Sequence, residues 1–341
     1  MTNQNQKILI ICGPTASGKT SLAISVAKSL ISLSSPATAG LTPPPSVNLL
    51  SADSRQIYQG LDIVTGKDLP SSLSPKIHFF GLDLVQPDTI FNLSDYTQYA
   101  RQVISDSLSQ KVPLIIVGGT GLYLKALTSN LLTYQVPPNR KLRTVLEKLD
   151  LPSLQKKLLE LNPSKYTSLN HSDLHNPRRL IRAIEISSSL PESGLQAPRH
   201  CEERKRPACR QAGVAISLHP ETKLSFHWIG LRQDKEDQSA SIRQRVLERL
   251  DAGAIDEVKK LIKKYPDKSL ALFTSLGVRE IIDYLHQKIS RDKLVELWTS
   301  AEIDYARRQM VWFQKQPEII WYDMSSRQNQ KLAIKLAKIF I

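Results

Sequence analysis

The sequence predicts an α/β protein in which helices flank a parallel sheet, with a mainly helical insertion domain after the third strand. Apolar runs suited to buried strands occupy residues 7–12, 47–51, 113–117 and 226–231, and helical stretches separate them. Residues 141–186 have a helical pattern without a convincing strand. Apolar strands that alternate with helices are typical of a parallel sheet covered on both faces. We therefore expect a parallel core that a helical domain interrupts.

The first half of the chain supports this sheet element by element. Residues 7–12 (KILIIC) are apolar after the lysine and predict a buried strand, and residues 21–30 predict the helix that follows. Residues 34–46 are rich in Ser, Pro and Thr, which favours an extended surface loop. Residues 47–51 predict the second strand. Residues 113–117 (PLIIV) predict a third, which runs into a glycine-rich turn.

The second half contains the insertion and the return to the core. Residues 187–221 break the helical pattern with prolines, cysteines and a basic run, so we predict a non-catalytic insert there. Residues 226–231 predict a further strand, and residues 239–264 and 291–315 predict long helices. The expected domains are a first part of the core at 1–130, a helical domain at 131–222, and a second part of the core with C-terminal helices at 223–341.

Composition and charge restrict the class of protein. The longest apolar run near the start, residues 8–12, is too short for a membrane span or a secretory signal, so we expect a cytoplasmic protein without membrane contact. Cys12, Cys201 and Cys209 form neither a disulfide framework nor a CxxC zinc pair. Lys+Arg number 46 against 32 Asp+Glu, and the formal net charge of +14 favours a polyanionic partner.

The most specific motif is a complete GxxxxGK[ST] pattern between the first strand and the first helix. Its glycines let backbone N–H groups converge on phosphate oxygens, and the helix N-terminus adds a favourable dipole. Lys19 would neutralise phosphate charge, and Thr20 would bind Mg²⁺ directly or through water. The motif predicts a P-loop NTPase-like core, but it does not distinguish between a kinase, an NTPase and a diphosphate-using transferase. The phosphate-binding residues are Gly13, Pro14, Thr15, Ala16, Ser17, Gly18, Lys19 and Thr20.

A second motif, SADSRQIY at residues 51–58, follows the second strand. Asp53 is therefore expected at the carboxyl end of a strand beside the P-loop, where open α/β sheets bind ligands. A carboxylate there could bind Mg²⁺ or accept a proton. The alternative is that Asp53 caps the N-terminus of a helix.

Further motifs follow along the chain: VGGTGLY at 117–123, NPRRLIRAIE at 176–185, IRQRVLERL at 242–250, SLGVRE at 275–280 and YARRQMVWF at 305–313. Together with GPTASGKT and SADSRQIY, they resemble motifs of the tRNA dimethylallyltransferases, or isopentenyltransferases. The matches extend over most of the chain. GPTASGKT, SADS and GGTGLY are highly specific in this order and spacing. Val64, Ser241 and Val278 stand where the family usually has a glycine, an arginine and a tyrosine.

The resemblance implies transfer of a dimethylallyl group from dimethylallyl diphosphate to the N6 amine of adenosine 37 in tRNA. The loop amides, Lys19, Mg²⁺ near Thr20, and Arg245 would stabilise the negative charge of the departing diphosphate. Thr120 would hydrogen-bond the leaving oxygen, and Asp53 would take the proton from the amine. The P-loop would bind the diphosphate without hydrolysing ATP.

The resemblance also implies contacts with the anticodon loop, where the target adenine must leave its stack. Ser54, Arg55 and Gln56 would contact the target nucleotide beside Asp53 and Thr120. The remaining RNA contacts would come from the helical insertion and from the second part of the core, and we expect a monomer. These further candidates are Arg143, Arg178, Arg179, Arg182, Thr274 and Arg279.

Other activities stay open on the sequence. A P-loop small-molecule kinase would use ATP and would close the helical insertion over it as a lid, but GGTGLY and SADS have no role in that reaction. An adenylate dimethylallyltransferase would prenylate free AMP, whereas the helical insertion and the positive charge favour tRNA. A nucleic-acid-binding ATPase is disfavoured because no acidic pair ends an apolar strand, as its metal site would require.

Overall fold

The computed structural model describes residues 6–32, 44–67, 69–70, 72–129, 136, 138–189, 224–267, 270–324, 331–332 and 335–336. The chain divides into two compact units. The core unit comprises Met1–Ser129 and Ile216–Ile341, and the helical unit comprises Asn130–Ala215. No helix in the described ranges is long and apolar enough to span a membrane.

The core unit contains a six-stranded sheet in the order β3-β2-β4-β1-β5-β6, and every pairing is parallel. This arrangement confirms the predicted fold class. Strand β1 lies between β4 and β5, with Cys12 opposite both Gly118 and Gly230. The carboxyl ends of these strands therefore lie at one edge of the sheet. The strands are β1 (Gln6–Cys12), β2 (Val47–Ser51), β3 (Ile77–Phe80), β4 (Leu114–Gly118), β5 (Leu224–Arg232) and β6 (Ile319–Asp323).

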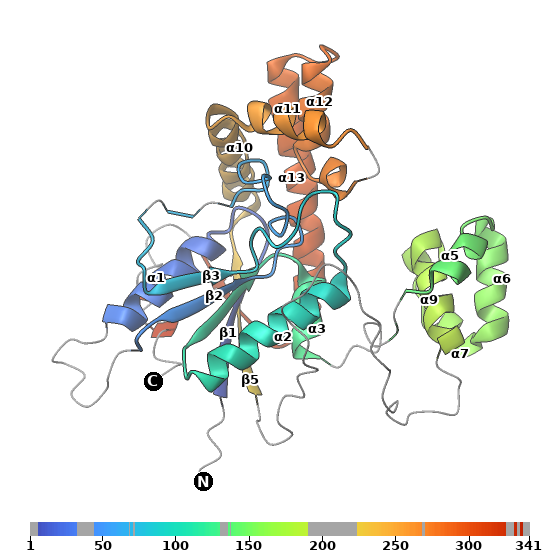
Figure 1. The fold of residues 1–341 in the computed structure, drawn as a ribbon, viewed down its shortest axis with the longest axis horizontal. Coiled ribbons are helices and arrows are strands. Elements are labelled where there is room, and N and C mark those ends of the chain that lie inside the picture. The colour runs from blue at the N-terminus through green and yellow to red at the C-terminus, as the bar shows by residue number, and fades with distance from the viewer. Residues whose placement is uncertain are drawn as a thin grey trace, which may run out of the picture. The chain divides into compact units, whose positions relative to one another are not determined.

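Helices cover both faces of the sheet, as Figure 1 shows for α1 (Lys19–Ser32) on one side and α2 (Leu93–Ser109) with α3 (Gly121–Thr128) on the other. The alternation along β1 explains the two cores. Leu9 and Ile11 pack in the cluster with α1, whereas Ile8 and Ile10 pack in the cluster with α2 and α3. Cys12 joins the second cluster, where burial raises the pKa of its thiol to about 12, so it is a core residue as expected.

A third apolar cluster stands beyond the carboxyl ends of the strands and is built by the C-terminal helices (Figure 1). Trp298 is fully buried in it, together with Ile57 and Leu61 from the segment after β2. The helix expected at 239–264 is two helices, because Gly253 adopts a left-handed φ of 99° between them. The elements are α10 (Lys235–Asp251), α11 (Ala254–Lys264), the 3₁₀ turn η2 (Ala271–Thr274), α12 (Val278–Leu285) and α13 (Arg291–Phe313).

The helical unit contains short helices around a small core of Leu146, Leu154, Leu158, Leu180 and Ile184. Its described residues include no strand, which confirms the helical pattern predicted from residue 141 onward. Asn or Asp side chains cap four of the helices, as expected where the chain turns sharply between them. The helices are α5 (Arg140–Leu146), α6 (Leu151–Leu161), α7 (Pro163–Thr167), α8 (His171–Leu174) and α9 (Pro177–Ser189).

Two predicted segments fall mainly outside the described residues. They are the surface loop expected at 34–46, apart from 44–46, and the insert expected at 187–221, apart from the last residues of α9. Cys201 and Cys209 also lie outside the described ranges.

Candidate active site

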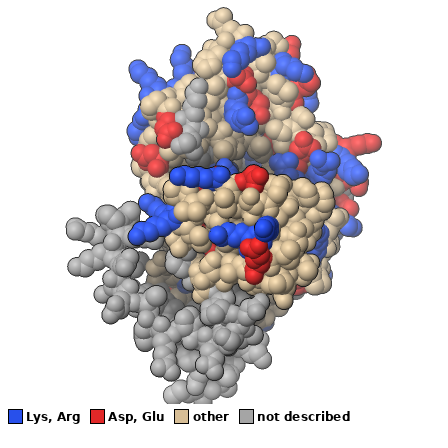
Figure 2. All heavy atoms as spheres, turned by 90° about the vertical axis from the view of Figure 1, so that its right-hand side faces the viewer, with Lys and Arg blue, Asp and Glu red and all other residues tan. Residues whose placement is uncertain are grey.

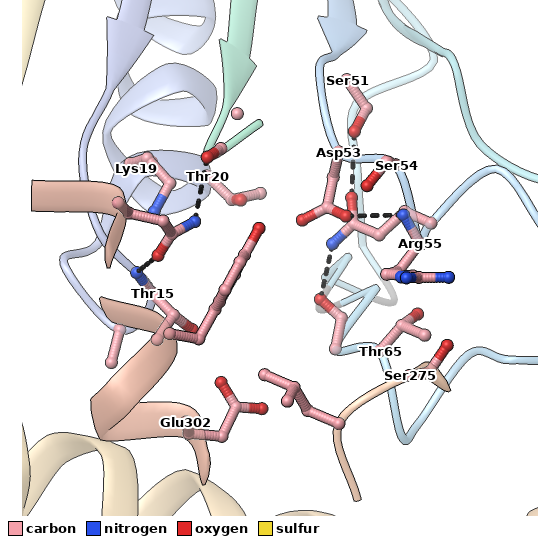
Figure 3. A pocket seen from close by; sticks show the side chains of 18 of the residues that line it. Thr15, Lys19, Thr20, Ser51, Asp53, Ser54, Arg55, Thr65, Ser275 and Glu302 are labelled. Atoms are coloured by element: carbon pink, nitrogen blue, oxygen red, sulfur yellow. Dashed lines mark hydrogen bonds between the residues drawn. The ribbon is translucent and has the colours of Figure 1, made fainter. Parts of the chain in front are cut away.

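A pocket of about 340 Å³ opens in the core unit where β1, β2 and β4 end (Figure 3). The loop after β1 and the loop after β2 face each other across it, and α10 and α13 supply a further wall. Many of the residues predicted from the two loop motifs therefore meet in one cavity. The predicted site residues that line it are Thr15, Ala16, Lys19, Thr20, Asp53, Ser54, Arg55, Gln56, Arg245 and Thr274.

The loop at residues 13–18, which we call the phosphate loop, depends on unusual backbone angles. Gly13 has φ 141° and lies against β5, where a Cβ would come 2.4 Å from the carbonyl oxygen of Leu231. Gly18 has φ 80°, and Ala16 adopts a left-handed φ of 60°, which is uncommon for a residue with a side chain. Helix α1 begins at Lys19 directly after this loop, and Lys19 and Thr20 of its first turn line the pocket. The N–H groups of a first helical turn have no partner within the helix, so they can bind an anion.

The Lys19 ammonium lies inside the pocket (Figure 3). It donates to the carbonyl oxygen of Pro14, and the hydroxyl of Ser17 lies 3.5 Å from it. Burial, together with the nearby Arg245 guanidinium, lowers the pKa of Lys19 to about 8, and the Asp53 carboxylate opposes both effects. Two cations therefore repel each other in a partly desolvated site. An anionic ligand between them would relieve that repulsion.

The loop after β2 places the Asp53 carboxylate in the pocket, as Figure 3 shows. One carboxylate oxygen accepts the backbone N–H of Arg55 at 2.8 Å, so Asp53 closes a local turn and caps none of the described helices. Thr120, at the N-terminus of α3, is joined to the same loop: its hydroxyl oxygen accepts the N–H of Ser54 at 3.0 Å, and its own N–H donates to Ala52 at 3.1 Å. Asp53 and Thr120 are thus held in one hydrogen-bonded unit.

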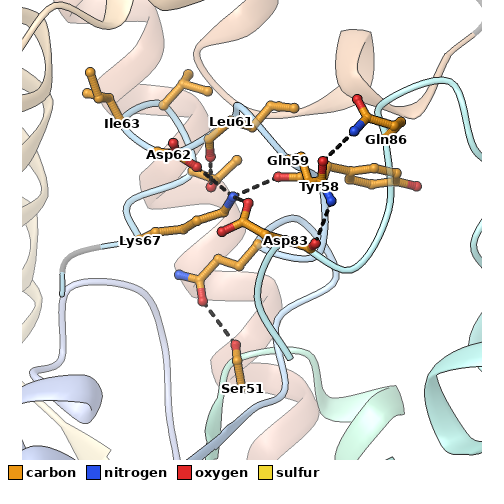
Figure 4. Close-up of polar contacts among 12 residues, drawn as sticks. Ser51, Tyr58, Gln59, Leu61, Asp62, Ile63, Lys67, Asp83 and Gln86 are labelled. Atoms are coloured by element: carbon orange, nitrogen blue, oxygen red, sulfur yellow. Dashed lines mark hydrogen bonds and ion pairs between the residues drawn. The ribbon is translucent and has the colours of Figure 1, made fainter. Parts of the chain in front are cut away.

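The segment that follows Asp53 is fixed by a set of polar contacts (Figure 4). The Lys67 side chain is almost fully buried, donates to the carbonyl oxygen of Tyr58 and to Asp62 at 2.7 Å each, and pairs with Asp83. Glu257 of α11 accepts three successive backbone N–H groups, those of residues 62–64. This segment is therefore a rigid part of the pocket wall.

Helices α10 and α13 contribute residues that the sequence motifs did not single out as site residues. Arg249 and Glu302 form an ion pair at 2.9 Å, and each side chain is only 9% exposed. Gly66 lies against this pair, since a Cβ there would come 2.3 Å from the Arg249 guanidinium. Glu302, Tyr305 and Gln309 lie on one face of α13 and line the pocket. Glu302, Tyr305 and Gln309 are three and four residues apart, in and just before YARRQMVWF. This helical spacing could have predicted from the sequence that the three side chains share one face.

The predicted arginines of the helical unit, Arg143, Arg178, Arg179 and Arg182, are described within that unit alone. Arg143 and Arg182 both pair with Glu185, whose side chain is 1% exposed. Burial tends to raise the pKa of Glu185, but hydrogen bonds from these two arginines hold that pKa below its ordinary value. Arg179 pairs with Asp173, and the Arg178 side chain is exposed. Arg279, on α12 of the core unit, is also exposed and lies outside the pocket lining.

We expect Glu185→Gln to destabilise the helical unit by about 2 kcal/mol, the size of effect found for hydrogen bonds to charged groups. The Arg143 guanidinium donates two hydrogen bonds to Glu185, at 2.7 and 2.8 Å, and Arg182 donates a third at 2.9 Å. Glutamine cannot accept all of them with a full negative charge. Chemical denaturation of the whole chain measures the change.

Arg178→Ala is the matched control for that variant, because it removes an exposed charge from the same helix. It should leave the free energy of unfolding unchanged within about 0.5 kcal/mol. Equal destabilisation by both variants would contradict the structural role of the Glu185 network.

The fold and the phosphate loop place this chain in the class of P-loop-like α/β proteins. An IPP transferase family model matches residues 56–316. The tRNA dimethylallyltransferase 1 of Syntrophus aciditrophicus is 34% identical over 97% of this chain and 98% of its own length. The tRNA dimethylallyltransferase of Halothermothrix orenii is 29% identical over 98% of this chain and 93% of its own. The chain belongs to the IPP transferase family.

Solved structures share the fold. The tRNA isopentenylpyrophosphate transferase of Bacillus halodurans matches with a TM-score of 0.64 and 24% identity, over 98% of this chain and 95% of that one. A eukaryotic dimethylallyltransferase acting on tRNA matches with a TM-score of 0.72 and 19% identity, over 98% and 80%. The family model and the relatives confirm the family resemblance seen in the sequence, and they do not favour a small-molecule kinase.

Proposed function

We propose that this chain is a tRNA dimethylallyltransferase, which moves the dimethylallyl group of dimethylallyl diphosphate to the N6 amine of adenosine 37. The products are N6-(dimethylallyl)adenosine and diphosphate. The observation that carries the proposal is the pocket itself, in which the Lys19 ammonium at the start of α1 lies in the same cavity as the Asp53 carboxylate on the loop after β2. Membership of the family supports the same activity.

The phosphate loop supplies the donor half of the reaction. As the prenyl carbon separates from the diphosphate, the C–O electron pair leaves with the oxygen and negative charge builds up on the leaving group. The N-terminal N–H groups of α1, the Lys19 ammonium and the Arg245 guanidinium already surround the place where that charge develops. Because these groups need no rearrangement, they lower the barrier.

The loop after β2 supplies the acceptor half. The N6 lone pair forms the new N–C bond, and the nitrogen then releases one proton, which Asp53 takes. The adenine must leave its stack to enter the pocket. Ser54, Arg55 and Gln56 line the pocket beside Asp53 and are placed to contact the base. The Thr120 hydroxyl would donate a hydrogen bond to the leaving oxygen.

Mg²⁺ is part of the proposal. Thr20 lies in the first turn of α1 and lines the pocket beside Lys19. Within the described part of the chain, no group of three or more His, Cys, Asp or Glu side chains could hold a metal ion. Mg²⁺ in such sites keeps several waters and is bound by few protein oxygens together with substrate phosphates. The Thr20 hydroxyl fits this role, and the bound ion would neutralise charge on the diphosphate.

The acceptor is tRNA in this proposal because the chain carries a formal net charge of +14. On the face shown in Figure 2, Lys and Arg side chains lie among Asp and Glu side chains, so positive charge is spread over that surface rather than gathered in one patch. Contacts therefore depend on individual residues, and the exposed Arg178 and Arg279 are the best placed of the predicted arginines. Phosphate contacts by such residues would make binding depend on salt.

Incubation of the protein with labelled dimethylallyl diphosphate tests the proposal. We expect label to enter unmodified tRNA that contains adenosine 37, and not the same tRNA with another base at that position. If label entered added free AMP and not tRNA, the acceptor would be a mononucleotide, and the proposal that tRNA is the substrate would be wrong. Phosphate transfer from ATP to a small molecule, without prenyl transfer, would overturn the proposal.

The Lys19 pKa predicts how donor binding depends on pH. Below about pH 8 the Lys19 ammonium is already formed in the free protein, so titration of Lys19 should not change the affinity for dimethylallyl diphosphate in that range. Above pH 8 the bound anion favours the protonated lysine, so binding takes up a proton and the affinity should fall by up to tenfold per pH unit. Calorimetric titration without tRNA at pH 7 to 9.5 measures this.

Arg245→Met provides the control, because the Arg245 guanidinium is one cause of the lowered pKa. The pH at which affinity begins to fall should then rise. An affinity that stays level to pH 9.5 in the unmodified protein would contradict the prediction.

A further inference from the structure

The side chain of Gln309 joins the two loops that carry the proposed chemistry. Its Oε1 accepts the backbone N–H of Thr15 at 2.8 Å, and its Nε2 donates to the carbonyl oxygen of Gly119 at 3.0 Å. Thr15 belongs to the phosphate loop after β1, and Gly119 to the turn after β4. Gln309 itself comes from α13 and is 7% exposed. One buried amide group therefore links three segments that are distant in the sequence.

The contact on the phosphate loop fixes the peptide group between Pro14 and Thr15. In a trans peptide the C=O and N–H point in opposite directions. The N–H points to Gln309, and the carbonyl oxygen on the other side accepts the Lys19 ammonium and, at 2.9 Å, the Ser17 hydroxyl. Rotation of this peptide would remove the acceptor that holds Lys19. Figure 3 shows the bond at Thr15 as a dashed line next to the Lys19 side chain.

The contact on the other loop fixes the turn that carries Thr120. Gly119 precedes Thr120, whose backbone and hydroxyl are bonded to Ala52 and Ser54 on either side of Asp53. The last sheet pairing between β1 and β4 joins Cys12 to Gly118, so both loops continue past the sheet. Gln309 is thus a cross-link beyond the strand ends.

Helix α13 is held firmly enough to act as the support for this cross-link. Trp298, near its start, is fully buried in the third apolar cluster, and Phe313, at its end, is fully buried in the cluster with α2 and α3. Between these anchors Glu302 pairs with Arg249 of α10. The indole of Trp312 lies where a Cβ on Gly121 would come within 2.2 Å, so the turn after β4 packs directly on the helix.

We propose that Gln309 is a positioning residue that sets the spacing between the diphosphate held by the phosphate loop and the Thr120–Asp53 unit that meets the amine. This inference rests on the proposed transferase activity. An amide suits the role because it presents an acceptor and a donor on one rigid plane, which neither a carboxylate nor an apolar side chain does. Its loss would leave the N–H of Thr15 and the C=O of Gly119 without a side-chain partner.

Gly119 gives an independent way to break the same cross-link. A Cβ on Gly119 would lie 2.3 Å from Nε2 of Gln309, and the other atoms near it are at 3.4 Å or beyond. The φ of Gly119 is not positive, so alanine is compatible with the backbone. Gly119→Ala therefore displaces the Gln309 amide without a further clash at that position.

The test compares Gln309→Met and Gly119→Ala with a matched control. Asn48→Leu removes a buried amide whose Nδ2 donates to Ser107 at 2.9 Å, between β2 and α2 and outside the pocket lining. We expect both site variants to lower kcat for tRNA by about tenfold to a hundredfold, as small misplacements of reacting groups do, and to weaken dimethylallyl diphosphate binding, with KM for tRNA within about twofold. Asn48→Leu should lower thermal stability and leave kcat and donor affinity unchanged.

The double variant with Gln309→Ala and Gly119→Ala completes the test. It should lower kcat no more than Gln309→Ala alone, since the added methyl group then has no amide to displace. Additive losses would overturn the inference, as would near-normal kcat in Gln309→Met. Donor affinity is measured without tRNA, so it tests Gln309 even if the unmodified protein transfers no prenyl group, a result that would count against the proposed function alone.

Discussion

Asp53→Asn should lower kcat for prenyl transfer on the order of a hundredfold or more while tRNA binding is retained. Asparagine keeps an oxygen that can accept the Arg55 N–H, so the turn after β2 should persist. It cannot take a proton from the N6 amine, and proton removal by a positioned base contributes about a hundredfold or more to such rates. Asp53→Ala should lose at least as much, because it also removes the contact to Arg55. Steady-state kinetics with saturating donor and tRNA measure the change, and filter binding measures tRNA affinity.

The control is Asp83→Asn. Asp83 is a half-exposed carboxylate that pairs with Lys67 outside the pocket lining, and Lys67 keeps Tyr58 and Asp62 as partners when that charge is lost. Turnover should stay within about twofold of the unmodified protein, since asparagine keeps an oxygen that can accept a hydrogen bond from Lys67. Near-normal kcat in Asp53→Asn at saturating substrates would show that Asp53 is not the base.

The central strands of the sheet could be predicted from the sequence, because a strand buried on both faces is a continuous apolar run. Strands β1, β2 and β4 are buried on both faces, and their sequences are apolar for nearly their whole length. Strands β3 and β6 were not predicted. They lie at the two edges of the sheet and span four and five residues, with exposed or half-buried positions that interrupt the apolar pattern. A short edge strand is determined by its neighbour more than by its own sequence.

The two loops of the site were predictable because their chemistry is local. A phosphate loop needs its glycines and its lysine within a few residues, and Asp53 comes two residues after the end of β2. Gln309 shows why other contacts of the site could not be predicted from the sequence. Its partner Thr15 is 294 positions away in the sequence, and the residues around Gln309 do not indicate this contact. Arg143 and Arg182 were predicted to contact RNA, and the sequence did not indicate that both pair with the buried Glu185.

Lys19→Met should lower kcat by about a hundredfold to a thousandfold and weaken dimethylallyl diphosphate binding, since it removes one preorganised cation from the leaving group. Methionine approximates the length of the lysine stem, so the packing of the side chain against the phosphate loop should be kept. The carbonyl oxygen of Pro14 would lose its ammonium partner but keep the Ser17 hydroxyl at 2.9 Å. The loop should therefore stay folded, and the loss should fall on the chemistry.

Lys28→Met separates this effect from a change in overall charge. Lys28 lies on the same helix, α1, is exposed, and is absent from the pocket lining, so its removal changes the net charge equally. If the Lys19 ammonium acts on the departing diphosphate, only Lys19→Met lowers kcat, and it should also abolish the fall in donor affinity above pH 8. If instead general positive charge attracts the substrates, both variants should raise KM for tRNA and leave kcat unchanged. The fall in affinity above pH 8 would then persist in Lys19→Met, and the assignment of Lys19 to the leaving group would be wrong.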